Sequence, residues 1–128
     1  MNEETRRSIY NKLKHNLEKF APPMVSRDSK ENGDFELIGN KPVPYGHDKK
    51  IVPGMYFASI AHRKDSVAFY FFPAYMDPEL KKIAPSLVKY LKGKTCFHFK
   101  KEEQVDVIEL NELLKRGIDA WTKAGYMK

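Results

Sequence analysis

The sequence predicts an α+β domain, an antiparallel β-sheet with a helix at each end of the chain. Three observations predict it. Apolar residues recur at helical spacing near both ends of the chain, segments rich in aromatic and β-branched residues lie between them, and turn residues bound those segments. A chain of 128 residues fits one domain, so we expect residues 1–128 to form a single unit.

The first predicted element is a helix over residues 3–20. Its apolar residues recur three to four positions apart, and two glutamates stand at the end where the helix dipole is positive. Asn2 can accept a hydrogen bond from the first turn and so cap the helix. Pro22 and Pro23 follow it, and proline cannot continue a helix. We therefore expect the helix to end just before them.

Two short strands are predicted next, over residues 24–27 and 35–38. The Asn32-Gly33 dipeptide between them is typical of a tight hairpin turn. Residues 39–54 contain three prolines and further glycine, which predicts a long irregular connection. Connections of that length are either functional or mobile.

The clearest strand signals lie over residues 55–62 and 67–72. Both segments are rich in aromatic and β-branched residues, and polar residues between them indicate a turn. Both faces of this hairpin are largely apolar. We expect one face to pack on the helices and the other to be covered by chain, partner or ligand, or left partly exposed.

A second helix signal begins at Asp77-Pro78-Glu79, where a capping side chain precedes a proline and an acid. Pro85 interrupts the apolar stripe that follows, which predicts a kink or two short helices in tandem before the last strand. Gly93 is the expected stop of this helix.

The last strand is predicted over residues 95–99. Alternate residues of a strand share a face, so Cys96 and His98 point one way and the two phenylalanines point the other, toward the core. A final helix begins at Asp106, has an apolar stripe at helical spacing and ends at Gly125.

The basic charge of the chain is concentrated in one segment. The net charge is +6, and residues 79–101 alone carry seven lysines against one acidic residue. This excess can attract an anion and surrounds the strand that holds the cysteine–histidine pair. The sequence therefore predicts a ligand-binding site for an anionic small molecule or an acidic protein at Lys92, Lys94, Cys96 and His98.

Several other classes of function are excluded or disfavoured. One cysteine cannot form an internal disulfide, which excludes a disulfide-stapled scaffold. The N-terminus is polar and no apolar run is long enough to span a bilayer, so we expect a cytoplasmic protein with no membrane partner. Basic residues are absent from the aromatic run 69–72, so nucleic-acid binding remains only an alternative.

A thiol and an imidazole on one strand face could also activate a nucleophile or form half a metal site. No second pair of cysteine or histidine residues has ligand spacing, and no oxyanion-hole motif is present. The sequence therefore assigns no catalytic residue, no metal ligand and no cofactor. It favours a non-enzymatic binding protein, with a thiol-dependent enzyme as the open alternative.

Short motifs along most of the chain, from Phe20 to Tyr126, carry a family resemblance. The motifs are Ala21-Pro22-Pro23-Met24, Met55-Tyr56-Phe57-Ala58, Phe69-Tyr70-Phe71-Phe72-Pro73 and Leu91-Lys92-Gly93-Lys94-Thr95-Cys96-Phe97-His98, with Gly117 and Trp121 in the last helix. In these motifs the chain resembles the YdhG-like family of small bacterial domains of unknown function (domain-of-unknown-function family 1801). The resemblance implies a frataxin-like fold, with the N- and C-terminal helices packed on one face of the sheet, and an intracellular iron chaperone as an alternative function. The first helix has three glutamates against five basic residues, unlike the acidic ridge of frataxins, so no iron ligand is carried over.

Overall fold

The computed structural model describes residues 1–29 and 34–128. Its helices are α1 (Glu3–Glu18), α2 (Leu80–Ile83) and α3 (Val107–Lys123), with 3-10 turns η1 (Phe72–Met76), η2 (Leu87–Tyr90) and η3 (Glu102–Gln104). Its strands are β1 (Val25–Ser29), β2 (Asp34–Ile38), β3 (Val43–Tyr45), β4 (Lys50–Val52), β5 (Tyr56–His62), β6 (Val67–Phe71), β7 (Leu91–Lys92) and β8 (Cys96–Phe99).

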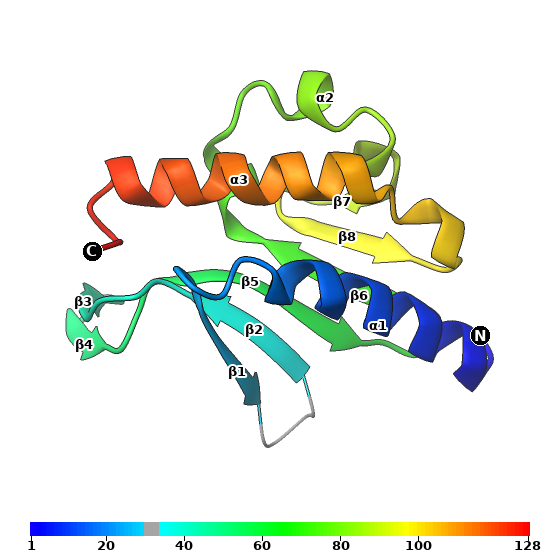
Figure 1. Ribbon diagram of the computed structural model, residues 1–128, viewed down its shortest axis with the longest axis horizontal. Helices are drawn as coiled ribbons and strands as arrows, with labels where there is room; N and C mark the ends of the chain where they lie inside the picture. The colour runs from blue at the N-terminus through cyan, green and yellow to red at the C-terminus, as the bar shows by residue number, and fades with distance from the viewer. Residues whose placement is uncertain (30–33) are drawn as a thin grey trace.

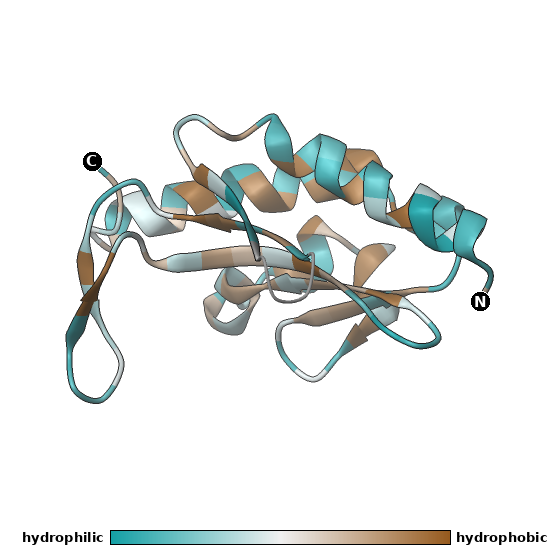
Figure 2. Cartoon of the chain, turned by 90° about the horizontal axis from the view of Figure 1, so that it is seen from below, coloured by the Kyte–Doolittle hydropathy of each residue, from teal (hydrophilic) through white to brown (hydrophobic). Residues whose placement is uncertain are grey.

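Six of these strands form one antiparallel sheet in the order β1-β2-β5-β6-β8-β7 (Figure 1). The two long helices, α1 and α3, lie together on one side of it, as Figure 2 shows. This arrangement confirms the predicted α+β fold class. The layer between helices and sheet holds the largest fully buried side chains, among them Phe57, Phe69, Phe71, Phe97, Phe99 and Trp121.

Both terminal helices begin where the sequence predicts. The Asn2 side chain accepts a hydrogen bond from the Thr5 amide at 2.7 Å, and the Asp106 side chain accepts one from the Glu109 amide at 3.0 Å. Each bond satisfies an amide that has no partner within its helix. The last helix ends at Lys123, just before Gly125, whose φ of +87° suits a residue without a side chain.

The predicted strands are confirmed, with small shifts at their ends. β1 pairs with β2 and β5 pairs with β6, both antiparallel. The turn predicted at Asn32-Gly33 lies outside the described residues. Phe69 and Phe71 face the helices and are buried, so the aromatic run 69–72 is mainly core and offers no row of exposed rings for stacking bases.

The irregular connection predicted over residues 39–54 is wrong. This segment contains the β3–β4 hairpin, which projects from one end of the sheet on the side away from the helices (Figure 2). The prolines misled the prediction, because a proline is excluded from central strands but tolerated at an edge, and both strands of a two-stranded ribbon are edges. Pro44 pairs there with Ile51.

The segment between β6 and β8 confirms one prediction and corrects another. Two short helices in tandem, α2 and η2, flank Pro85 as expected, and η1 precedes them. Gly93 does not end a helix, because η2 has already ended at Tyr90. Instead Gly93 has a φ of +73° in the turn between β7 and β8. A positive φ is needed at both kinds of site, so glycine alone does not distinguish them.

Candidate functional site

One row of side chains crosses the whole sheet on the face away from α1 and α3. The register of every strand pair places its members opposite one another, one from each strand. Side chains alternate between faces along a strand, so these residues are set apart from the buried phenylalanines that face the helices. We call this set the polar row: Arg27, Glu36, Ser59, Tyr70, Cys96 and Lys92.

A chain of three polar side chains begins at Cys96 in the polar row and continues through His98 to Ser66. The Cys96 Sγ lies 3.2 Å from His98 Nε2, and the Ser66 Oγ lies 3.2 Å from His98 Nδ1. Ser66 is buried, with 6% of its surface exposed. Both imidazole nitrogens therefore have partners, and the ring is held between a hydroxyl and a thiol.

Burial keeps both titratable members of this chain neutral. It raises the pKa of the Cys96 thiol, although a hydrogen bond with Tyr70 and the charge of Arg63 act in the opposite direction. Burial lowers the pKa of His98, and the charges of Lys92 and Arg63 lower it further. At neutral pH the pair is therefore a thiol beside a neutral imidazole, and not a thiolate–imidazolium ion pair.

The middle of the polar row is held by internal hydrogen bonds. The Arg63 guanidinium lies over the Tyr70 ring, 5.5 Å from its centroid, and donates to the Tyr70 hydroxyl. The Tyr56 and Ser59 hydroxyls lie 2.6 Å apart, and burial raises the pKa of Tyr56 to about 12. These side chains are already satisfied by one another, so the centre of the row is a poor place for a ligand.

At the β8 end of the sheet a cavity of about 460 Å³ opens between the β5–β6 turn, η2 and the end of β8. We call it the basic pocket. Its charged and polar lining includes three lysines, one aspartate, and the serine and histidine of the Ser66–His98–Cys96 chain. These residues are Asp65, Ser66, Lys89, Lys92, His98 and Lys100.

A second cavity, of about 650 Å³, lies around the turn between β7 and β8. We call it the turn pocket. Lys94 lines it, with its ammonium 4.8 Å from the centroid of the Tyr75 ring. The turn pocket and the basic pocket have one lining residue in common, Lys89.

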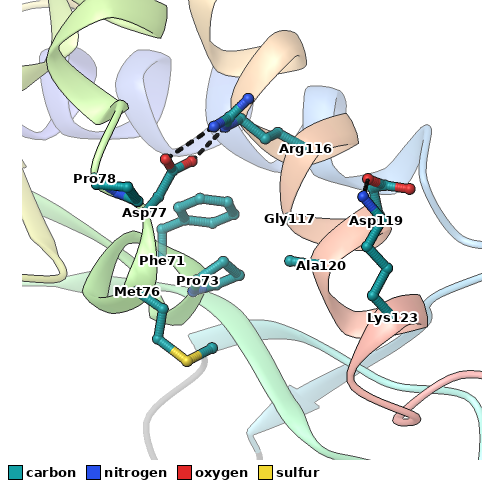
Figure 3. Close-up of a pocket in the computed structure, with 10 residues that line it drawn as sticks. All are labelled: Phe71, Pro73, Met76, Asp77, Pro78, Arg116, Gly117, Asp119, Ala120 and Lys123. Atoms are coloured by element: carbon teal, nitrogen blue, oxygen red, sulfur yellow. Dashed lines mark hydrogen bonds and ion pairs between the residues drawn. The ribbon is translucent and has the colours of Figure 1, made fainter.

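A third cavity, of about 240 Å³, lies between η1 and α3 (Figure 3). Its charged side chains are paired with one another. Arg116 holds Asp77 through two hydrogen bonds, and Lys123 pairs with Asp119 at 3.1 Å. Because opposite charges meet across or beside it, this cavity has no excess of either sign to attract an ion.

The structure brings together three of the four residues that the sequence predicts as a site. Lys92 and Cys96 are cross-strand partners, and His98 lies beside them on the same face. Lys94 does not join them, because the turn at Gly93 carries it to the turn pocket.

Ser66 was missed by the sequence reasoning. It is 32 residues from His98 along the chain, and no local motif signals the contact. The pairing of β6 with β8 brings the two together, so Ser66 could have been found only from the strand order.

Within residues 1–29 and 34–128, no group of three or more histidine, cysteine, aspartate or glutamate side chains could hold a metal ion. No helix in this part of the chain has the length and apolarity needed to cross a membrane. Comparisons with protein-family models, with curated proteins and with solved structures find no match to this chain.

Proposed function

We propose that this protein is a non-enzymatic binding protein for a small anion, which it holds in the basic pocket. The observation that carries the proposal is the set of lysines around that pocket. Lys89, Lys92 and Lys100 all line it, and none of them forms an ion pair with a carboxylate among the described residues. Three unpaired positive charges around one cavity favour an anionic ligand.

The remaining lining supports a ligand with several anionic oxygens. The Ser66 hydroxyl accepts a hydrogen bond when His98 Nδ1 carries the proton, so its own O–H can donate to a ligand at the inner wall, while the lysines supply charge at the rim. A volume of about 460 Å³ suits a small molecule, since ligand cavities are typically ~300–1,000 Å³. Phosphate, diphosphate and short polycarboxylates have the required charge and size.

The neutral thiol and imidazole favour binding over catalysis. A cysteine nucleophile needs to reach its thiolate form, and burial opposes that for Cys96. We therefore propose that Cys96 holds the His98 ring in place and does not react with the ligand.

A titration with inorganic pyrophosphate at low ionic strength tests this proposal. We expect the double variant Lys92→Gln/Lys100→Gln to bind at least about tenfold more weakly, because losing even one hydrogen bond to a charged group costs on the order of 1.5 kcal/mol or more. The matched control is Lys49→Gln/Lys50→Gln, which removes the same charge from the β3–β4 hairpin. Equal affinities of the two double variants would refute the proposal.

Lys94 provides a further discriminating measurement. The sequence grouped it with Lys92, but the structure places it in the turn pocket. Charge reversal at Lys92 is therefore expected to weaken pyrophosphate binding far more than charge reversal at Lys94. A stronger effect of Lys94→Glu would move the anion site to the other pocket.

A further inference from the structure

The turn pocket has an apolar floor as well as a basic rim. Leu80, Val88 and Leu91 line it from α2, η2 and β7, and Leu80 is buried. Its volume of about 650 Å³ exceeds that of the basic pocket. Such a floor can bind the apolar body of a ligand by removing it from water.

Both walls of the turn pocket are fixed to α3. The Glu109 carboxylate accepts hydrogen bonds from the Ser86 and Leu87 amides at 2.9 and 3.0 Å, which holds the start of η2. Arg116 holds Asp77 at the junction of η1 and α2. The pocket is therefore formed before any ligand binds, so binding loses little conformational entropy of the protein.

The rim carries an excess of positive charge. Lys81, Lys89 and Lys94 line the pocket without an ion pair to a carboxylate among the described residues. Asp77 is the one acidic lining residue, and its carboxylate is already bound by Arg116. An anionic head group would therefore find three free ammonium groups and no competing free carboxylate.

An exposed aromatic ring completes the rim. Tyr75 is 58% exposed, and the Lys94 ammonium lies over its ring. A planar aromatic group can stack on such a ring, and the adjacent ammonium can contact a charge attached to that group. These features favour an aryl ligand over a purely aliphatic one.

We infer that the turn pocket is a second binding site, which takes a small aromatic carboxylate. Its ring lies on the apolar floor against Tyr75, and its carboxylate contacts Lys81, Lys89 and Lys94. The inference does not rest on the anion site proposed above, because the two pockets share only Lys89.

The probe for this site is 2-naphthoate, with 2-naphthalenemethanol as its uncharged counterpart. We expect naphthoate to bind at least about tenfold more tightly than the alcohol, as one charge-assisted contact contributes on the order of 1.5 kcal/mol or more. Amide shifts in a heteronuclear NMR titration are expected around Leu91, Gly93 and Lys94. Lys81→Glu/Lys94→Glu is expected to reduce naphthoate affinity to that of the alcohol, and Tyr75→Ala to weaken both ligands.

The variant Lys92→Glu/Lys100→Glu serves as the matched control, and it is expected to keep full naphthoate affinity. Equal affinity for naphthoate and the alcohol in the unaltered protein would overturn the inference. So would naphthoate binding that is lost in Lys92→Glu/Lys100→Glu and kept in Lys81→Glu/Lys94→Glu. Because pyrophosphate reports on the basic pocket and naphthoate on the turn pocket, either site can fail without the other.

Discussion

Cys96 shows how its surroundings set the chemistry of a single side chain. It has an imidazole partner, which suggests reactivity, yet it is partly withdrawn from water, which raises its pKa. A thiol with a raised pKa stays protonated below that value, and the protonated form is a poor nucleophile. The environment therefore favours the protonated thiol over the thiolate that a thiol-dependent enzyme would need.

The rate of alkylation of Cys96 by iodoacetamide should report the protonation state of its thiol directly. We expect its pH midpoint to lie above that of glutathione measured in parallel. Tyr70→Phe should raise the midpoint further, because the hydrogen bond from Tyr70 lowers the pKa of the thiol. Tyr45→Phe, in the distant β3–β4 hairpin, serves as the control. A midpoint below that of glutathione would instead show an activated thiolate.

The residues of the predicted site and Ser66 beside it differ in how local their sequence signals are. The shared face of Cys96 and His98 follows from strand alternation alone and could be predicted. The position of Lys94 could not, because it depends on where η2 ends and how the turn at Gly93 is shaped. Ser66 required the pairing of distant strands.

At the scale of elements, α3 packs closely on the sheet at Gly117. A Cβ atom there would lie 2.7 Å from the Phe71 ring and 2.8 Å from the Phe57 ring. Both rings are buried and in edge-to-face contact with each other, so neither can move aside freely. The glycine therefore lets the helix approach the sheet at a position where its helix propensity alone would be unfavourable.

Gly117→Ala tests whether packing outweighs propensity in α3. Alanine at an exposed helix position would stabilise by about 1 kcal/mol relative to glycine. We expect the opposite sign here, a loss of about 1–3 kcal/mol in the free energy of unfolding, because overpacking a core carries that cost. Urea denaturation measures it, with Lys115→Ala on the exposed side of the same helix as the control. A stabilised Gly117→Ala variant would mean that the Phe57 and Phe71 rings shift to make room for the added methyl group.

Elements with strong local signals were predicted well, and those that depend on context were not. The terminal helices carry caps and apolar stripes, so their positions could be read from Asn2 and Asp106 onward. The β3–β4 hairpin was missed because Pro44 argues against a strand unless the strand is known to be an edge. Tertiary position, rather than residue preference, decided that case.

For the molecule as a whole, the segment between β6 and β8 links the two proposed sites. It provides walls for both pockets, yet it contains only short helices that could not form alone. Its contacts with α3 through Glu109 and Arg116 hold it in place. Five of the seven lysines that the sequence concentrates in residues 79–101 thereby line two cavities that share Lys89.

The Arg116–Asp77 pair gives this arrangement a pH dependence with a definite sign. Hydrogen bonds from Arg116 hold the pKa of Asp77 below its usual value, so the ionised carboxylate stabilises the folded state. That contribution is fully present above about pH 4, the ordinary pKa of aspartate, and is lost as the pH falls through the lower folded-state value. Asp77→Asn should therefore lower the urea midpoint at pH 6, whereas near pH 3 its midpoint should lie closer to that of the unaltered protein. Asp119→Asn removes an exposed pair and should change little at either pH. If Asp77→Asn were as stable as the unaltered protein at pH 6, the pair would not be what holds the segment to α3, and the walls of the turn pocket would depend on Glu109 alone.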